Sequence, residues 1–246
     1  MDAAEAEADL AAALDALAGP ATFWWRDDDA GRDDPRLRRL MALAGERGVD
    51  LALAVVPDWL EDGAAAALEG CPRATVLQHG IDHRDHARPG EKRIELGGAA
   101  PADLLADGLA VGRDRLAARF GDRFLPVLVP PWNRIDAALV GRLPALGYRG
   151  LSAFGPRPAD PPLRQANTHL DLIAWRDGRR PLTLPEALAG LAGLVRRAPR
   201  EPVGLLSHHL VADGAAFLTL DRVLAILHNH PKALLVGARE LFGEAE

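Results

Sequence analysis

The sequence predicts an α/β fold, most simply an irregular (β/α) barrel of parallel strands that forms one domain over residues 1–246. Short apolar runs bounded by turn residues alternate along the chain with longer amphipathic stretches. The apolar runs are continuous, which is typical of parallel strands covered on both faces. A length of 246 residues also fits one large domain of this kind. An open doubly wound sheet is the alternative architecture.

Strands and helices can be placed on this pattern. The expected strands are Ala21–Trp25, Leu51–Val56, Ala74–Gln78, Phe124–Val129, Tyr148–Ser152, Leu170–Ala174, Val203–Ser207 and Ala233–Val236. Helices are expected where apolar residues recur every three or four positions and a glycine or proline follows. These stretches are Asp9–Ala18, Asp34–Arg47, Leu60–Leu68, Ala102–Phe120, Ile135–Leu146, Leu184–Arg197 and Gly214–His228.

The composition excludes several classes of function. Lys and Arg number 29 against 35 Asp and Glu, and a net charge of −6 does not favour binding to nucleic acid. The single cysteine, Cys71, excludes an internal disulfide framework and a cysteine-rich zinc site. The acidic start Met1–Glu7 is unlike a secretory signal, and no apolar run approaches the roughly 18 residues of a membrane span. We therefore expect a cytoplasmic protein without a membrane span, of undefined oligomeric state.

Polar side chains that can bind a metal ion or transfer a proton follow four of the expected strands. Arg26–Asp29 follow the first strand, Gln78–His86 the third, Val129–Arg134 the fourth and Ser207–His209 the seventh. The carboxyl ends of parallel strands meet at one edge of a sheet, and this edge carries the active site in α/β folds. The sequence therefore predicts that the four clusters form one site.

The histidine cluster indicates a metal site. His79, His83 and His86 lie close together in the sequence, and imidazole is a common ligand for zinc-like ions. Two histidines and one aspartate, with positions left open for water, are typical of a catalytic metal centre. The adjacent carboxylates of Asp27–Asp29 also favour a nearby cation, although a solvated acidic turn is the alternative interpretation.

The seventh strand ends in two histidines, His208 and His209. Because neighbouring strand residues point to opposite faces, we expect only one of them to face the site, as a general acid or base. A buried structural histidine is the alternative. Trp59, Trp132 and Trp175 each lie near the end of an expected strand, and aromatic walls suit the apolar faces of sugar rings.

These clusters resemble the motifs of the polysaccharide deacetylases of the NodB-homology superfamily. Trp25–Ala30 is similar to their first motif, usually Thr-Phe-Asp-Asp-Gly, and His79–His83 to their second, His-Ser/Thr-x-x-His. Pro131-Trp132 stands where the third motif carries Pro-Tyr, and Leu206–His208 fits the fifth, Leu-x-His. The motifs occur in the family's order and span about residues 24–209. The resemblance implies a distorted (β/α) barrel of about seven strands.

The resemblance also implies a role for each matching residue. Asp28, His79 and His83 match the metal ligands, which usually hold zinc and in some members cobalt or nickel. Asp27 matches the catalytic base and His208 the general acid. Further contacts to the oxyanion or the substrate are expected from the backbone N–H of Trp132 and from Asn133, Arg134, His209 and Trp175.

Two departures from the family pattern concern the carboxylates. The arginine of the third motif, which pairs with the base, is Val129 here, and the hypothesis is that Arg26 or Arg134 pairs with Asp27 instead. The glycine of the first motif is Asp29, which adds a candidate ligand and leaves open a shift of base and ligand by one residue.

Other departures lie further along the chain. The Ser/Thr of the second motif is Gly80, which lacks a side chain to hold the loop. His86 is an additional candidate ligand or substrate contact. No fourth motif matches, although its region contains Asn167, His169, Asp171 and Trp175.

The leading hypothesis is an enzyme, a metal-dependent hydrolase that removes an N-acyl group, expected to be acetyl, from an amino sugar or glycan precursor. The alternative is a carbohydrate- or metal-binding module that keeps the fold with weakened catalysis, because the arginine of the third motif is absent. A non-haem iron oxygenase shares the ligand set of two histidines and one carboxylate, but its usual β-sandwich does not fit the strand-helix alternation.

Overall fold

The computed structural model describes residues 1–197 and 201–243, and within these residues a nine-stranded sheet forms the centre of the molecule. Its strand pairs are parallel, in the order β6-β5-β4-β3-β2-β1-β10-β7, with β11 paired to β1 beside this path. The strands are β1 Ala21–Ala30, β2 Leu51–Val55, β3 Ala74–His79, β4 Phe124–Val129, β5 Gly150–Leu151, β6 Arg164–Gln165, β7 Leu170–Asp171, β10 Val203–Ser207 and β11 Ala233–Leu235. A separate antiparallel pair joins β8 Ile173–Ala174 to β9 Arg180–Pro181.

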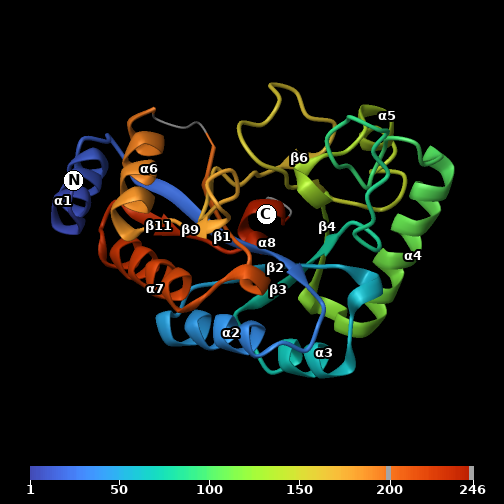
Figure 1. Cartoon of the computed structure of the whole chain (residues 1–246), viewed down its shortest axis with the longest axis horizontal. Coiled ribbons are helices and arrows are strands. Elements are labelled where there is room, and N and C mark those ends of the chain that lie inside the picture. Colours follow the sequence, from blue (N-terminus) through green and yellow to red (C-terminus); the bar gives the residue numbers. More distant parts are fainter. Residues whose placement is uncertain (198–200, 244–246) are drawn as a thin grey trace.

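Helices cover the outside of the curled sheet, and α8 lies within its curve (Figure 1). They are α1 Ala3–Asp15, α2 Pro35–Arg47, α3 Asp62–Glu69, α4 Ala102–Phe120, α5 Ala137–Val140, α6 Leu184–Arg196, α7 Gly214–Asn229 and α8 Ala238–Phe242. Short 3-10 turns are η1 Pro57–Trp59, η2 Gly121–Arg123, η3 Pro131–Asn133 and η4 His209–Val211. Among the helices of the described residues, none combines the length and the apolar character that crossing a membrane requires. The curled parallel sheet confirms the predicted distorted-barrel class.

Most predicted elements are present, and the exceptions have local causes. Strands β2, β3, β4 and β10 and helix α4 lie within one residue of the predicted bounds, whereas β1 runs to Ala30, five residues beyond its predicted end at Trp25. The predicted helix Ile135–Leu146 is wrong beyond α5, because Pro144 has no N–H to continue the helical hydrogen bonds and turns follow instead. The predicted strand Leu170–Ala174 is divided between β7 and β8, which belong to different sheets. Strands β6 and β9 contain two residues each, which is too short for a hydrophobic pattern to predict them.

Apolar cores on both faces of the sheet explain why the strands are apolar throughout. On the outer face, side chains such as Leu40 of α2, Leu188 of α6 and Leu224 of α7 form the larger core. On the inner face, Trp24 of β1 packs edge-on against Phe242 of α8, with ring centroids 6.1 Å apart. Burial on both faces holds the strands firmly, so the residues at their carboxyl ends have defined positions.

A bulge near the end of β1 determines where its aspartates point. Asp27 pairs with Leu53 of β2, and Ala30 pairs with Val55. Asp28 and Asp29 therefore lie opposite a single residue of β2. Asp29 has a φ of 68°, a left-handed conformation that Asp adopts more readily than most residues. Bulges of this kind re-aim side chains next to functional sites. The regular alternation of side chains along the strand therefore ends at Asp27.

Candidate functional site

Asp29, His79 and His83 converge at the carboxyl ends of β1 and β3. The Oδ1 atom of Asp29 lies 3.2 Å from Nε2 of each histidine, and one ligand atom from each residue lies within 4.8 Å of the others. Nδ1 of His79 lies 2.9 Å from the carbonyl oxygen of Val129. Because a carbonyl only accepts, Nδ1 carries a proton, which leaves Nε2 as the nitrogen that faces the group.

The chemistry of this group fits a divalent cation. Burial opposes ionisation of Asp29, but hydrogen bonds from His79 and His83 outweigh it and hold the pKa of this carboxyl far below its ordinary value. The side chains of Asp29 and His83 remain 21% and 16% exposed, so one side of the group is open. One carboxylate and two imidazoles with an open side match the donor set of a catalytic zinc site.

Asp28 lies next to this group but forms a different contact. Arg26 holds its carboxylate in a bidentate ion pair, with Nε 2.8 Å from Oδ1 and Nη2 3.0 Å from Oδ2. The same guanidinium donates to Oγ of Ser152 at 2.6 Å and to Oδ1 of Asn133 at 2.9 Å. Both members of the ion pair are buried, so Asp28 is held in one orientation.

These contacts correct two assignments made from the sequence. Asp29, and not Asp28, reaches the histidines, because the bulge in β1 turns the two carboxylates in different directions. Arg26 pairs with Asp28 rather than with Asp27. The geometry thus places Asp29 with the histidines and Asp28 with the arginine, a difference of one residue that the third carboxylate had left open.

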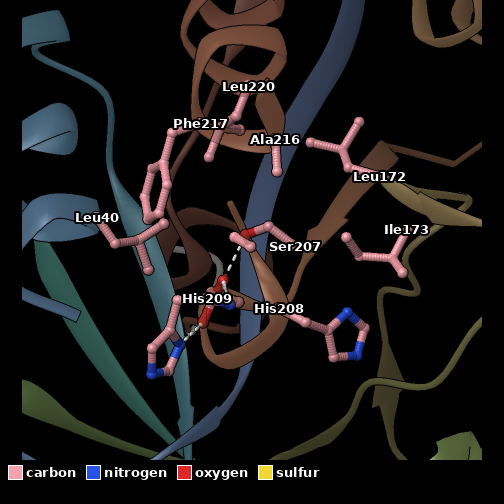
Figure 2. A pocket seen from close by; sticks show the side chains of 11 residues that line it. Leu40, Leu172, Ile173, Ser207, His208, His209, Ala216, Phe217 and Leu220 are labelled. Atoms are coloured by element: carbon pink, nitrogen blue, oxygen red, sulfur yellow. Dashed lines mark hydrogen bonds and ion pairs between the residues drawn. The ribbon is translucent and has the colours of Figure 1, made fainter. Parts of the chain in front are cut away.

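Asp27, the expected base, points to the face of β1 opposite the Asp29 group and is 0% exposed. Its carboxylate accepts hydrogen bonds from Oγ of Ser207 at 2.6 Å and from the backbone N–H of His209 at 3.1 Å, and Nδ1 of His209 lies 2.5 Å away. Figure 2 shows the two histidines turned to opposite sides of the end of β10, with His209 beside a small and largely apolar cavity. Asp27 and His209 thus form a buried pair behind the candidate site.

His208 is the histidine that faces the site, as the alternation along β10 predicts. Its Nδ1 lies 3.5 Å from Oδ1 of Asp171, and its ring packs edge-on against Trp175 at 4.9 Å. Nε1 of Trp175 donates to Oδ2 of Asp171 at 2.6 Å, which fixes this carboxylate. Burial alone would lower the pKa of His208, but Asp171 together with the charges of Asp28 and Asp29 raises it to about 9.

Glu95 holds the loop that carries His83. This side chain is buried, and its Oε1 accepts the backbone N–H groups of Ile81, Asp82 and His83 at 3.1, 2.8 and 2.8 Å. Gly80 has a φ of 59°, and a Cβ at this position would collide with Oε2 of Glu95. Glu95 therefore supplies the loop contact that Gly80 cannot make, and nothing in the sequence motifs pointed to it.

The remaining predicted residues divide between the site and its margin. The ring of Trp132 lies 4.5 Å from the ring of His83, and both Trp132 and Asn133 have left-handed backbones, with φ of 53° and 56°. Nδ1 of His86 lies 2.7 Å from the backbone oxygen of Glu95, and His86 does not join the Asp29 group. Arg134 donates to the backbone oxygen of residue 93 at 2.8 Å, so it does not replace the missing arginine.

Two residues of the site were not assigned from the sequence. Asp171 lies in the region of the missing fourth motif, and its spacing of four residues from Trp175 was the available signal. Glu95 follows the histidine cluster in a loop without regular structure and gave no signal of its own.

The fold is that of the polysaccharide deacetylases. A structure titled as a putative polysaccharide deacetylase from Mycobacterium smegmatis is similar with a TM-score of 0.65 and 13% identity over 92% of this chain and 90% of that chain. The Bc1960 peptidoglycan N-acetylglucosamine deacetylase gives a TM-score of 0.61 and 11% identity, over 92% of each chain. BA3943 of Bacillus anthracis, described as a CE4 family pseudoenzyme, gives 0.61 and 13% over 92% of this chain and 66% of that chain. Neither a protein-family model nor a curated protein matches the sequence.

Proposed function

We propose that this protein is a metal-dependent hydrolase that removes an N-acyl group, with acetyl the expected one, from an amino sugar or glycan precursor. One observation carries the proposal. An Asp-His-His group, an arginine-bound carboxylate and an aspartate-bound imidazole lie together at the carboxyl ends of the strands. The similarity of fold to a deacetylase of N-acetylglucosamine in peptidoglycan supports the choice of an amide substrate.

In this proposal Asp29, His79 and His83 hold the cation, for which zinc is the expected ion and cobalt or nickel are alternatives. When bound, a cation of this kind polarises the amide carbonyl and makes a water molecule more acidic. The ring of Trp132 packs against His83 and restricts the imidazole to the orientation that the group requires. The backbone N–H of Trp132 is the expected donor to the oxyanion.

Asp28 and His208 carry the two proton transfers. Asp28 accepts a proton from the water that attacks the carbonyl carbon, and Arg26 orients its carboxylate for this step. His208 donates its proton to the amide nitrogen as the C–N bond breaks, and Asp171 orients its ring. The products are a carboxylic acid and a free amine.

Release of acetate from N-acetylated glucosamine oligosaccharides tests the proposal. We expect protein reloaded with zinc, cobalt or nickel to release acetate, and metal-free protein to release none. Asp28→Asn should lower turnover by roughly 100- to 10,000-fold, which is the contribution of a general base. Asp107→Asn, an exposed change on α4, is the matched control and should leave the rate unchanged. Wild-type turnover in the Asp28→Asn variant contradicts the assignment.

A binding module without turnover is the second candidate function. The observation that favours it is the similar fold of BA3943, which is described as a pseudoenzyme. Binding of these oligosaccharides without acetate release by any metal-loaded form would support this candidate over the hydrolase.

A further inference from the structure

Three tryptophans contact the histidines of the candidate site. Trp59 of η1 and Trp132 of η3 both pack against His83, with ring centroids 5.3 and 4.5 Å from the imidazole. Trp175, which follows β8, packs against His208 at 4.9 Å. The three indoles come from three different strand ends, so they form a wall around the site rather than one local cluster.

An exposed arginine lies over each of these tryptophans. The three arginines come from the segment after β1, the loop after β3 and the turn between β8 and β9. A guanidinium that stacks on an indole keeps the N–H groups at its edge available to a ligand. The pairs are Arg32 over Trp59 at 4.6 Å, Arg93 over Trp132 at 5.9 Å and Arg179 over Trp175 at 5.9 Å.

The acidic residues closest in sequence to the three arginines form few ion pairs with them. Asp33 pairs with Arg38 and Asp177 pairs with Arg180, so neither of these neighbours is engaged with the stacked arginines. Asp85 approaches Arg93 at 3.9 Å, at the limit of an ion pair. Over residues 1–197 and 201–243, Arg32 and Arg179 form no ion pair. Two of the three guanidinium groups over the tryptophans therefore keep an uncompensated positive charge, in a chain whose net charge is −6.

We propose that the substrate of this site is anionic: an N-acylated amino sugar that carries a phosphate or carboxylate, which the stacked arginines Arg32, Arg93 and Arg179 bind. This inference rests on the proposed function and names its substrate class. The planar guanidinium matches the two oxygens of these anions, whereas the hydroxyl groups of a neutral glycan gain nothing from its charge. The tryptophans beneath the arginines hold the guanidinium groups at the rim of the site, where the edge N–H groups face the ligand.

Equilibrium binding of charged and neutral sugars tests the inference. Calorimetry on zinc-loaded protein in the Asp28→Asn background, which slows turnover, compares N-acetylglucosamine 1-phosphate and N-acetylmuramic acid with methyl N-acetylglucosaminide. We expect at least one anionic sugar to bind about tenfold or more tightly than the neutral one, with a difference that shrinks at high salt. The phosphate and carboxylate sugars distinguish the two kinds of anion.

Arginine variants test whether the rim arginines cause the difference in affinity between anionic and neutral sugars. Arg32→Gln and Arg179→Gln should remove much of the difference between charged and neutral sugars. Arg149→Gln is the matched control, because this exposed arginine precedes β5 at the opposite edge of the sheet. Equal affinity for charged and neutral sugars, or no detectable binding of either, overturns the inference, as does an equal loss in Arg149→Gln.

Acetate release by wild-type protein, measured on the same sugars, separates this inference from the proposed function. Preferential binding of an anionic sugar without acetate release supports the charged substrate class and argues against hydrolysis. Acetate release at equal rates from charged and neutral sugars supports the hydrolase and overturns the inference.

Discussion

Three side chains of the candidate site are each held by a contact that the motifs did not assign. Arg26 holds Asp28, Asp171 holds His208 and the carbonyl of Val129 holds His79. These neighbours restrict which atom of each side chain faces the candidate site. Residue types and their order were therefore sufficient to locate the site, but not to assign the roles within it.

Replacing Asp171 tests how the proton affinity of His208 is set. The pKa of His208 is raised to about 9, so its proton is present below that pH and is lost as the pH rises through it. Asp171→Asn removes a main cause of this increase. We expect the alkaline limb of the pH profile of kcat/KM to move to lower pH, with the acidic limb unchanged. An alkaline limb that stays in place argues against His208 as the general acid.

Replacing Glu95 tests whether it positions the loop of His83. Glu95→Ala removes the oxygen that accepts three backbone N–H groups, so we expect the affinity for zinc to fall by roughly 10- to 100-fold. Glu95→Gln keeps an accepting oxygen and should retain most of the affinity. Competition with a chromophoric chelator measures both values. Equal zinc affinity in wild type and a folded Glu95→Ala variant excludes a positioning role.

At the scale of elements, hydrogen bonds behind the site join β1 to β10. Trp25 donates from Nε1 to Oγ of Ser207 at 2.9 Å, and Ser207 donates to Asp27 at 2.6 Å. All three residues are buried, so each donor depends on this network for its partner. The network fixes the end of β10, where His208 begins the turn toward the site.

Ser207→Ala measures the contribution of this network. The change leaves Nε1 of Trp25 without an acceptor in a buried position, which costs about 1–3 kcal/mol. Urea denaturation should show this decrease in the free energy of unfolding. The affinity for zinc should be nearly unchanged, because the Asp29 group lies on the other side of β1. A stability equal to wild type would show that water or a rearranged side chain replaces the hydroxyl group.

The same elements show what the sequence can and cannot predict. The strands that are buried on both faces, such as β4 and β10, have the predicted bounds because their apolar runs end sharply. The bulge in β1 leaves no trace in hydrophobic periodicity, so the choice between Asp28 and Asp29 needed the structure. The contact from Glu95 depends on how a long loop folds back, which spacing does not reveal.

At the scale of the whole molecule, the curled sheet brings together residues that are far apart in the chain. Asp29, His79 and His83 meet because β1 and β3 lie on either side of β2 and end at the same edge. His208 reaches this edge through the pairing of β10 with β1. The site therefore forms only in the folded chain. Binding of a cation there should depend on Asp29, which the bulge turns toward the histidines.

Metal content shows whether Asp29 holds a cation together with His79 and His83. Plasma mass spectrometry on protein purified without chelator, and on two variants, counts ions per chain after reconstitution with zinc, cobalt or nickel. We predict about one ion per chain in wild type and in Asp28→Asn, and loss of the ion in Asp29→Ala. Loss of the ion in Asp28→Asn with retention in Asp29→Ala would contradict the assignment, and no ion in any form would contradict a metal-dependent hydrolase.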